Sequence, residues 1–194
     1  MIAGWPPLPP AAPRPMTRTR MTTSAWRLGA MAAVLLSART AVAADPTAHA
    51  AFLPPVSAAC ISSPFGWRHA IGPFIPAGFH NGVDLAAPAG AEVHAAASGT
   101  IAGISLHGIG GLSVLIDHQN GRRTLYAHLG TVWGRIIDGQ RHVAAGDPIG
   151  HVGYTGLMRG THLFFAVFER GHAVDPEPLL NVQRCDPPAR ERGP

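Results

Sequence analysis

Short β-type segments separated by glycine and proline constrain the fold of this chain more than any other feature. The 194 residues include 23 Gly and 19 Pro, and no long stretch has apolar residues at helical spacing. Runs typical of strands recur between the Gly-rich breaks, at residues 100–105, 112–117, 123–129 and 162–168. This pattern predicts a mainly β domain, built from an antiparallel sheet, over about residues 60–182. Residues 176–182 resemble a short helix or turn.

Two of these strands are separated by a hairpin signal. Asn120-Gly121 lies between residues 112–117 and residues 122–129. Asn-Gly is a preferred pair for the two-residue turn that joins antiparallel strands. The sequence therefore predicts that these two strands are neighbours in the sheet.

Strand alternation predicts which side chains face the core. On the strand after the hairpin, the expected core face consists of Leu125, Ala127 and Leu129. The opposite face carries Thr124, Tyr126 and His128. On the last strand, the expected core face consists of Leu163, Phe165 and Val167, and the other face carries His162, Phe164, Ala166 and Phe168. Each strand thus places one histidine on the side opposite its core face.

The positive charge of the chain is concentrated at its beginning. The net charge is +4 and all 15 basic residues are Arg. Five of them lie within residues 1–44, whereas residues 45–194 carry ten Arg against eleven acidic residues, a net charge of −1. We therefore do not expect nucleic acid to be a partner, since the later part of the chain has no excess of positive charge.

Residues 16–44 have the layout of a secretory signal peptide. An Arg-containing start is followed by an apolar run at residues 28–36 and then by small residues suited to cleavage. That run is about half of the roughly 20 residues that a spanning helix needs, which disfavours an uncleaved membrane anchor. Residues 1–15 are Pro-rich, as in an over-long gene model, and are not expected to fold. We predict a leader over 1–44, a linker over 45–59 and a tail over 183–194. The product is expected to be exported, periplasmic or secreted, without stable membrane insertion after cleavage.

Export also affects how the two cysteines, Cys60 and Cys185, are interpreted. An oxidising compartment permits them to form a disulfide. Such a bridge would close a loop of well over 100 residues and contribute at most about 5 kcal/mol. The alternative is a pair of buried thiols. Their spacing excludes a CxxC-type zinc site.

Histidines carry the chemistry that the sequence suggests. All 11 His follow residue 44, and most are expected to be structural or exposed: His49, His69, His94, His107, His118, His142, His151 and His172. Three others lie in more informative contexts. His80 and Asp84 flank a glycine in HNGVD, and imidazole nitrogen with carboxylate oxygen suits Zn²⁺. His128 lies at the end of one strand and His162 opens the last one.

Together these segments resemble the lysostaphin/LytM-type zinc metalloendopeptidases, which cut peptides in bacterial peptidoglycan. The similar blocks, in the family's order, are PFGWR at 64–68, HNGVDLAAPAG at 80–90, GTI at 99–101, YAHL at 126–129, VAAGDPIGHVGYTG at 143–156 and VDP at 174–176. The resemblance implies a barrel-sandwich-like peptidase domain with a substrate groove. It also implies that His80 and Asp84 bind zinc, and that His128 and His162 are catalytic residues beside the metal-bound water.

One position departs from the family pattern. The third zinc ligand of the family is the second His of an HxH motif, and here that position is Phe164. Phenylalanine has no lone pair, whereas catalytic zinc ordinarily has three protein ligands and one open position. We therefore expect zinc binding to be weak or absent and hydrolysis by zinc-activated water to be impaired.

Two functions follow from this departure. The first is an exported endopeptidase of reduced activity toward cell-wall peptides. In it, His80 and Asp84 hold zinc, His162 or a water supplies the missing bond, and His128 acts as base or oxyanion stabiliser. The second is a degenerate, non-catalytic domain that binds peptidoglycan peptides in the same groove or regulates another cell-wall hydrolase. The residues alone leave open whether the chain is an enzyme.

Overall fold

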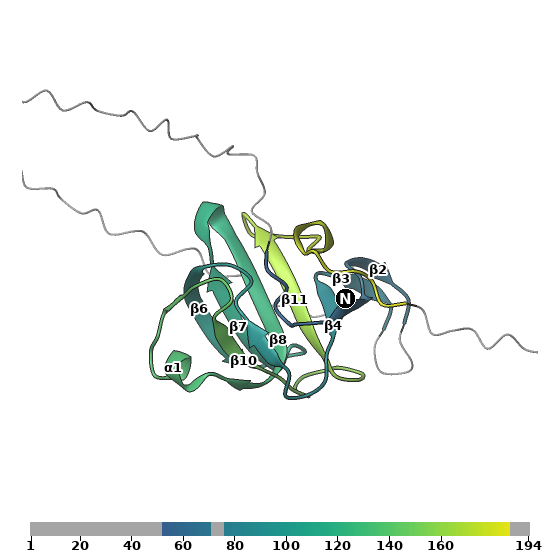
Figure 1. Cartoon of the computed structure of the whole chain (residues 1–194). Coiled ribbons are helices and arrows are strands. Elements are labelled where there is room, and N and C mark those ends of the chain that lie inside the picture. Colours follow the sequence, from purple (N-terminus) through teal and green to yellow (C-terminus); the bar gives the residue numbers. More distant parts are fainter. Residues whose placement is uncertain (1–51, 71–75, 187–194) are drawn as a thin grey trace, which may run out of the picture. The chain divides into compact units, whose positions relative to one another are not determined.

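The computed structural model describes residues 52–70 and 76–186 (Figure 1). These residues belong to one of the two compact units of the chain. The predicted leader, residues 1–44, lies outside the described residues, as do residues 45–51 of the predicted linker and residues 187–194 of the predicted tail.

The described part of the chain is mainly β, as predicted. Its strands are β1 (Cys60–Ser63), β2 (Gly66–Arg68), β3 (Gly78–His80), β4 (Val83–Ala86), β5 (Glu92–His94), β6 (Gly99–Leu106), β7 (Leu112–Asp117), β8 (Arg122–Val132), β9 (His142–Val143), β10 (Pro148–Val152), β11 (His162–Glu169) and β12 (His172–Val174). The helix α1 (Gly134–Ile137) is short, and 3₁₀ turns lie at Gln119–Gly121 and Glu177–Leu179. Across residues 52–70 and 76–186, no helix is both long enough and apolar enough to span a membrane.

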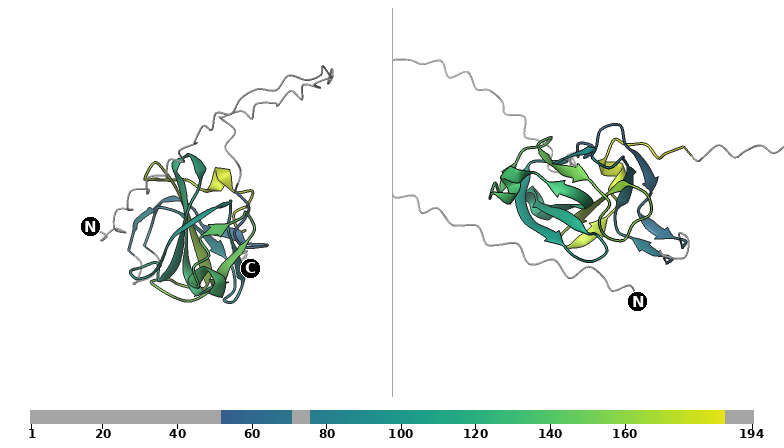
Figure 2. Two further views of the ribbon diagram at one scale, coloured as in Figure 1. Left: turned by 90° about the vertical axis from the view of Figure 1, so that its left-hand side faces the viewer. Right: turned by 90° about the horizontal axis from the view of Figure 1, so that it is seen from below.

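A 10-stranded antiparallel sheet organises these elements, with the order β1-β4-β11-β8-β7-β6-β9. β12 pairs with β11, and β10 joins β8 to β5. β2 and β3 form a separate two-stranded ribbon that lies near β4 (Figures 1 and 2). The pairing of β11 with both β4 and β8 is what brings distant parts of the sequence together.

The predicted hairpin is confirmed. β7 and β8 are antiparallel neighbours, and the turn between them contains Asn120 (φ 61°) and Gly121 (φ 72°). Two consecutive residues with positive φ are what a type I′ hairpin turn requires, because its twist matches that of the strands. The four strands predicted from sequence correspond to β6, β7, β8 and β11.

The predicted core face of β11 is confirmed, since Leu163, Phe165 and Val167 are completely buried in the main core. The prediction for β8 is wrong. Tyr126 belongs to the main core together with Leu129, so these side chains share a side although they are three residues apart.

A bulge at His128 explains the error. The backbone of His128 has φ 64°, and the register between β7 and β8 shifts between the pairs Leu112–Leu129 and Val114–Tyr126. β8 therefore has one residue more than β7 over this stretch. An extra residue in one strand breaks the two-residue alternation, so side chains beyond it change faces.

Both ends of the described domain pack on the sheet. Phe52 and Val56, within the predicted linker, are buried in the core. At the other end a disulfide joins Cys185 to Cys60, and the backbone N–H of Cys185 donates to the carbonyl of Ile61 at 2.9 Å. The predicted disulfide is thus present, and the alternative of free thiols is wrong. The compact unit extends beyond residues 60–182, because apolar side chains before this range fill the core and residues after it pair with β1.

Candidate functional site

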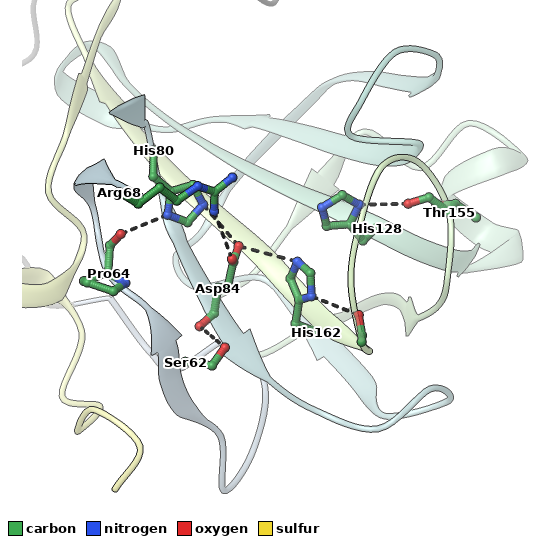
Figure 3. Close-up of polar contacts among 9 residues, drawn as sticks. Ser62, Pro64, Arg68, His80, Asp84, His128, Thr155 and His162 are labelled. Carbon is green, nitrogen blue, oxygen red and sulfur yellow. Dashed lines mark hydrogen bonds and ion pairs between the residues drawn. The ribbon is translucent and has the colours of Figure 1, made fainter. Parts of the chain in front are cut away.

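The predicted site residues come from four strands that meet at one place (Figure 3). His80 ends β3, Asp84 lies in β4, His128 lies in β8 and His162 begins β11. His80, Asp84 and His128 are all buried. The register of β11 places Phe164 directly opposite Asp84, so position 164 faces the same side of the sheet as the carboxylate.

The carboxylate of Asp84 is the centre of this cluster. Nε2 of His80 lies 3.2 Å from its Oδ1, and Nε2 of His162 lies 3.5 Å from the same oxygen. Nη1 of Arg68 lies 3.5 Å from its Oδ2. Burial by itself would raise the pKa of Asp84, but His80, His162 and Arg68 together outweigh burial and lower it. Asp84 is therefore an ionised acceptor at neutral pH.

Each of the three imidazoles is held through Nδ1 by a main-chain carbonyl. The Nδ1 atoms of His80, His128 and His162 lie 2.9, 2.8 and 3.2 Å from the carbonyl oxygens of Pro64, Thr155 and Gly160, respectively. A carbonyl oxygen can only accept, so each Nδ1 carries the hydrogen. When such a ring is neutral, its lone pair is on Nε2. In His80 and His162 this atom faces Asp84, and it donates to the carboxylate only when the ring is protonated.

The ring of His128 lies beside that of His162, edge to face, with centroids 4.8 Å apart. Figure 3 shows its Nδ1 turned toward Thr155 and its other side turned toward Asp84 and His162. Burial lowers the pKa of His128, while the Thr155 carbonyl and the Asp84 carboxylate act in the opposite direction. The geometry suits a neutral imidazole that accepts a proton at Nε2.

Phe164 places an aromatic ring among these imidazoles. Its centroid lies 5.4 Å from that of His80 and 6.3 Å from that of His128. The ring lies over Gly82, where a Cβ would stand 2.7 Å from Cζ of Phe164. The side of the cluster between His80 and His128 is therefore lined by carbon, which ligates no metal.

The residues present fit two ligand positions of a zinc ion. Ligand atoms at 2.0–2.1 Å from tetrahedral zinc are roughly 3.3 Å apart, and Nε2 of His80 and Oδ1 of Asp84 are 3.2 Å apart. The Pro64 carbonyl accepts from the other nitrogen of His80, an arrangement typical of metal-ligating histidines.

No described residue fits the third ligand position of a zinc ion. In the part of the chain that the structure describes, no three or more His, Cys, Asp or Glu side chains are arranged to hold a metal ion. Nε2 of His162 lies 3.5 Å from the same carboxylate oxygen as Nε2 of His80 (Figure 3), but among the described residues these side chains are not grouped as metal ligands. The three-ligand zinc site that the family resemblance implies therefore does not fit these residues in full.

Two residues contact the cluster without having been predicted to do so. Arg68 reaches Asp84 from β2, and Thr155 holds His128. Both lie in blocks that carry the family resemblance, residues 64–68 and 143–156. Neither contact has a signal in residue type or spacing, since one needs the β2–β3 ribbon and the other uses a main-chain carbonyl.

The antiparallel sheet and its His-Asp cluster define a domain of the metallopeptidase type. The sequence pattern described as peptidase family M23 matches residues 78–176, which is more than half of the chain. This chain belongs to peptidase family M23.

Two curated relatives match part of this chain. The DD-carboxypeptidase/endopeptidase Mpg of Neisseria meningitidis is 41% identical over 117 residues, which are 60% of this chain and 26% of the relative. The murein hydrolase activator EnvC of Escherichia coli is 34% identical over 100 residues, which are 51% of this chain and 23% of that protein. The matched region is thus about a quarter of the length of each relative.

Solved structures agree with the fold predicted from the lysostaphin/LytM resemblance. A zinc-containing peptidase from Vibrio cholerae has a TM-score of 0.56 at 29% identity, covering 71% of this chain and 41% of that one. The catalytic domain of lysostaphin from Staphylococcus simulans has a TM-score of 0.51 at 29% identity, covering 60% and 88%. The chain therefore contains a lysostaphin/LytM-type peptidase domain.

Proposed function

We propose that this protein is an exported, peptidoglycan-directed metallopeptidase-type domain whose capacity to hydrolyse peptide bonds is impaired. The observation that carries the proposal is the buried cluster of His80, Asp84, His128 and His162, with the ring of Phe164 on its remaining side. Two curated relatives, the DD-carboxypeptidase/endopeptidase Mpg and the murein hydrolase activator EnvC, support cell-wall peptides as the substrate class.

In this proposal His80 and Asp84 are the metal-binding residues and Phe164 replaces the third ligand. A zinc ion with full coordination would supply an activated water to reactions of this kind. His128 receives a proton at its bare Nε2 or, once protonated, donates a hydrogen bond to a peptide carbonyl. His162 acts beside it, and Asp84 pairs with Nε2 of His80 and of His162 when these rings are protonated.

An envelope location belongs to the same proposal. The signal-peptide pattern at residues 16–44 supports export to the periplasm or secretion. The disulfide between Cys60 and Cys185 supports an oxidising compartment, because cytosolic thiols are kept reduced. Peptidoglycan peptides are the partner expected there.

A second candidate function is a non-catalytic domain that binds peptidoglycan peptides or regulates another cell-wall hydrolase. Phe164 favours it, since a ring lies on the open side of the His80–Asp84 pair. The similarity to the murein hydrolase activator EnvC also favours it. The two candidates share the same groove and differ in whether a peptide bond is broken.

Incubation of the purified protein with peptidoglycan separates these candidates. We expect co-sedimentation with peptidoglycan and slow appearance of new peptide termini. His162→Gln should weaken binding, whereas His172→Gln, an exposed histidine on β12, is the matched control and should not. Absence of binding would contradict the endopeptidase and the peptide-binding domain, and would leave only a regulator of another hydrolase. Binding without any new termini would favour the second. Cleavage as fast as that of a Phe164→His variant would contradict the impairment.

A further inference from the structure

We propose that Thr155 is a positioning residue that fixes the imidazole of His128 with its bare nitrogen toward the cluster. The inference deepens the proposed function, because it takes His128 as a residue that faces the ligand. It applies equally to a domain that hydrolyses and to one that only binds.

The backbone of His128 is in an uncommon conformation that neighbouring segments impose on it. Its φ is 64°, in the left-handed region that is strained for a residue with a side chain and is enriched at functional sites. The N–H of His128 donates to the carbonyl of Gly110 at 2.9 Å, and its carbonyl accepts from Gly153 at 2.9 Å. Two loops thus hold the main chain of this histidine from either side.

The hydroxyl group of Thr155 ties these loops to the sheet. It accepts from the N–H of Leu112 at 3.0 Å, at the start of β7. It donates to the carbonyl of Leu129 at 2.8 Å, one residue after His128 in β8. The single hydrogen of the hydroxyl is used, and the backbone of Thr155 is fixed relative to both strands. Its carbonyl can then meet Nδ1 of His128 at 2.8 Å.

Glycines allow the two loops to approach this closely. Gly111 has φ 60°, and a Cβ there would collide with the main chain of Thr155. Gly156 has φ 81°, and a Cβ there would collide with the carbonyl of Ile109. The N–H of Leu157 donates to that same carbonyl at 2.8 Å. The position of the Thr155 carbonyl is therefore determined by main-chain packing as well as by its hydroxyl.

The consequence for His128 is a single tautomer. With Nδ1–H donating to Thr155, the lone pair lies on Nε2, on the side of His162 and Asp84 (Figure 3). If the carbonyl of Thr155 moved, the hydrogen could shift to Nε2, and that atom could no longer accept a proton. If Thr155 only joined the two loops, its substitution would leave the tautomer of His128 unchanged.

The test compares Thr155→Val, which keeps the shape but loses the hydroxyl, with Thr155→Ser, which keeps the hydroxyl. The measurement is the ¹⁵N-edited imidazole spectrum of the purified protein above the titration range of His128. The His128 signals are assigned by their loss in a His128→Gln variant. We expect the Nδ1–H tautomer alone in the native protein and in Thr155→Ser, and a mixture of tautomers in Thr155→Val.

An Nε2–H tautomer in the native protein would overturn the proposal, and this result needs no variant to fold. A folded Thr155→Val protein with an unchanged tautomer would also overturn it and leave Thr155 as a loop contact. The spectrum does not depend on turnover or on bound peptidoglycan. Failure of the proposed function and failure of this inference are therefore distinguishable.

Discussion

At the scale of single residues, Phe164 and Gly82 determine the shape of the site. The aromatic ring lies on the glycine, and a Cβ at residue 82 would stand 2.5 Å from the carbonyl oxygen of Phe165 and 2.7 Å from Cζ of Phe164. The main chain of β11 cannot retreat, because it is paired with β4 and β8. Glycine is thus required at position 82 because the main chain of β11 and the ring of Phe164 leave no room for a Cβ there.

A Gly82→Ala substitution should therefore destabilise the protein. We expect a loss of about 1–3 kcal/mol in the free energy of unfolding, as overpacking against a paired strand usually costs. Gly134→Ala is the matched control, since Gly134 lies in α1 with open space around it. The control should be neutral or slightly stabilising. Urea unfolding measures both, and equal stability of the two variants would contradict the close packing at residue 82.

Residues of the site were predictable from the sequence where the chemistry of their side chains suits a metal or a catalytic role. His80, Asp84 and His128 lie in sequence blocks that resemble the lysostaphin/LytM family, and His162 opens the last strand. The structure brings the four together. Arg68 was not predictable, because an arginine on a short ribbon has no distinguishing pattern.

At the scale of elements, local signals were enough for the strongest strands. Asn120-Gly121 specified the β7–β8 hairpin, and the apolar alternation of residues 163–167 specified the core face of β11. The faces of β8 were not predictable, because the bulge at His128 arises from contacts with two loops distant in sequence. A local sequence pattern carries no information on such a contact. The two-residue alternation therefore does not hold past the bulge.

The disulfide anchors a strand that is paired with a strand of the site. Cys60 lies in β1, which pairs with β4, the strand of Asp84. Cys60 and Cys185 are separated by 125 residues. Under a reductant we expect the free energy of unfolding to fall by roughly 2–5 kcal/mol.

The control for this prediction is the Cys60→Ser/Cys185→Ser double variant. Its unfolding midpoint should not respond to reductant, because it has no bridge to lose. A thiol count of two in the oxidised native protein would rule the bridge out.

At the scale of the whole molecule, a second polar network, partly buried, lies apart from the site. Nδ1 of His118 donates to the carbonyl of Ser98 at 2.9 Å, and its Nε2 lies 2.7 Å from Oγ1 of Thr124. Thr124 in turn lies 3.1 Å from the hydroxyl of Tyr126, which accepts from the N–H of Ala96. This network connects β8 to the segment between β5 and β6. His118 was expected to be structural or exposed, and the network gives it a structural role. Its two partners were not predictable from residue type or spacing.

The stability of the fold should depend on pH through His118. Burial lowers its pKa, Ser98 and Asp117 oppose that shift, and Arg122 adds to it. The unfolded chain therefore binds more protons than the folded one below about pH 6.5. The free energy of unfolding should fall as the pH decreases from about 7 to 5.

A His118→Asn variant should show a shallower fall over this range. The stability of the variant at pH 8 measures the packing that the substitution removes. The change in its stability between pH 7 and pH 5, compared with the native protein, then measures the contribution of His118 titration. Urea unfolding at several pH values gives both quantities. An equal or steeper slope in the variant would show that His118 does not contribute.

The central claim is that the His80–Asp84 pair lacks a third ligand because residue 164 is phenylalanine. Zinc content after dialysis against a trace of zinc, determined by elemental analysis of the native protein and of Phe164→His, tests it most directly. We predict well under one zinc ion per chain in the native protein and one per chain in Phe164→His. A native protein that retains one zinc ion per chain would contradict the claim, as would a folded Phe164→His variant that gains none.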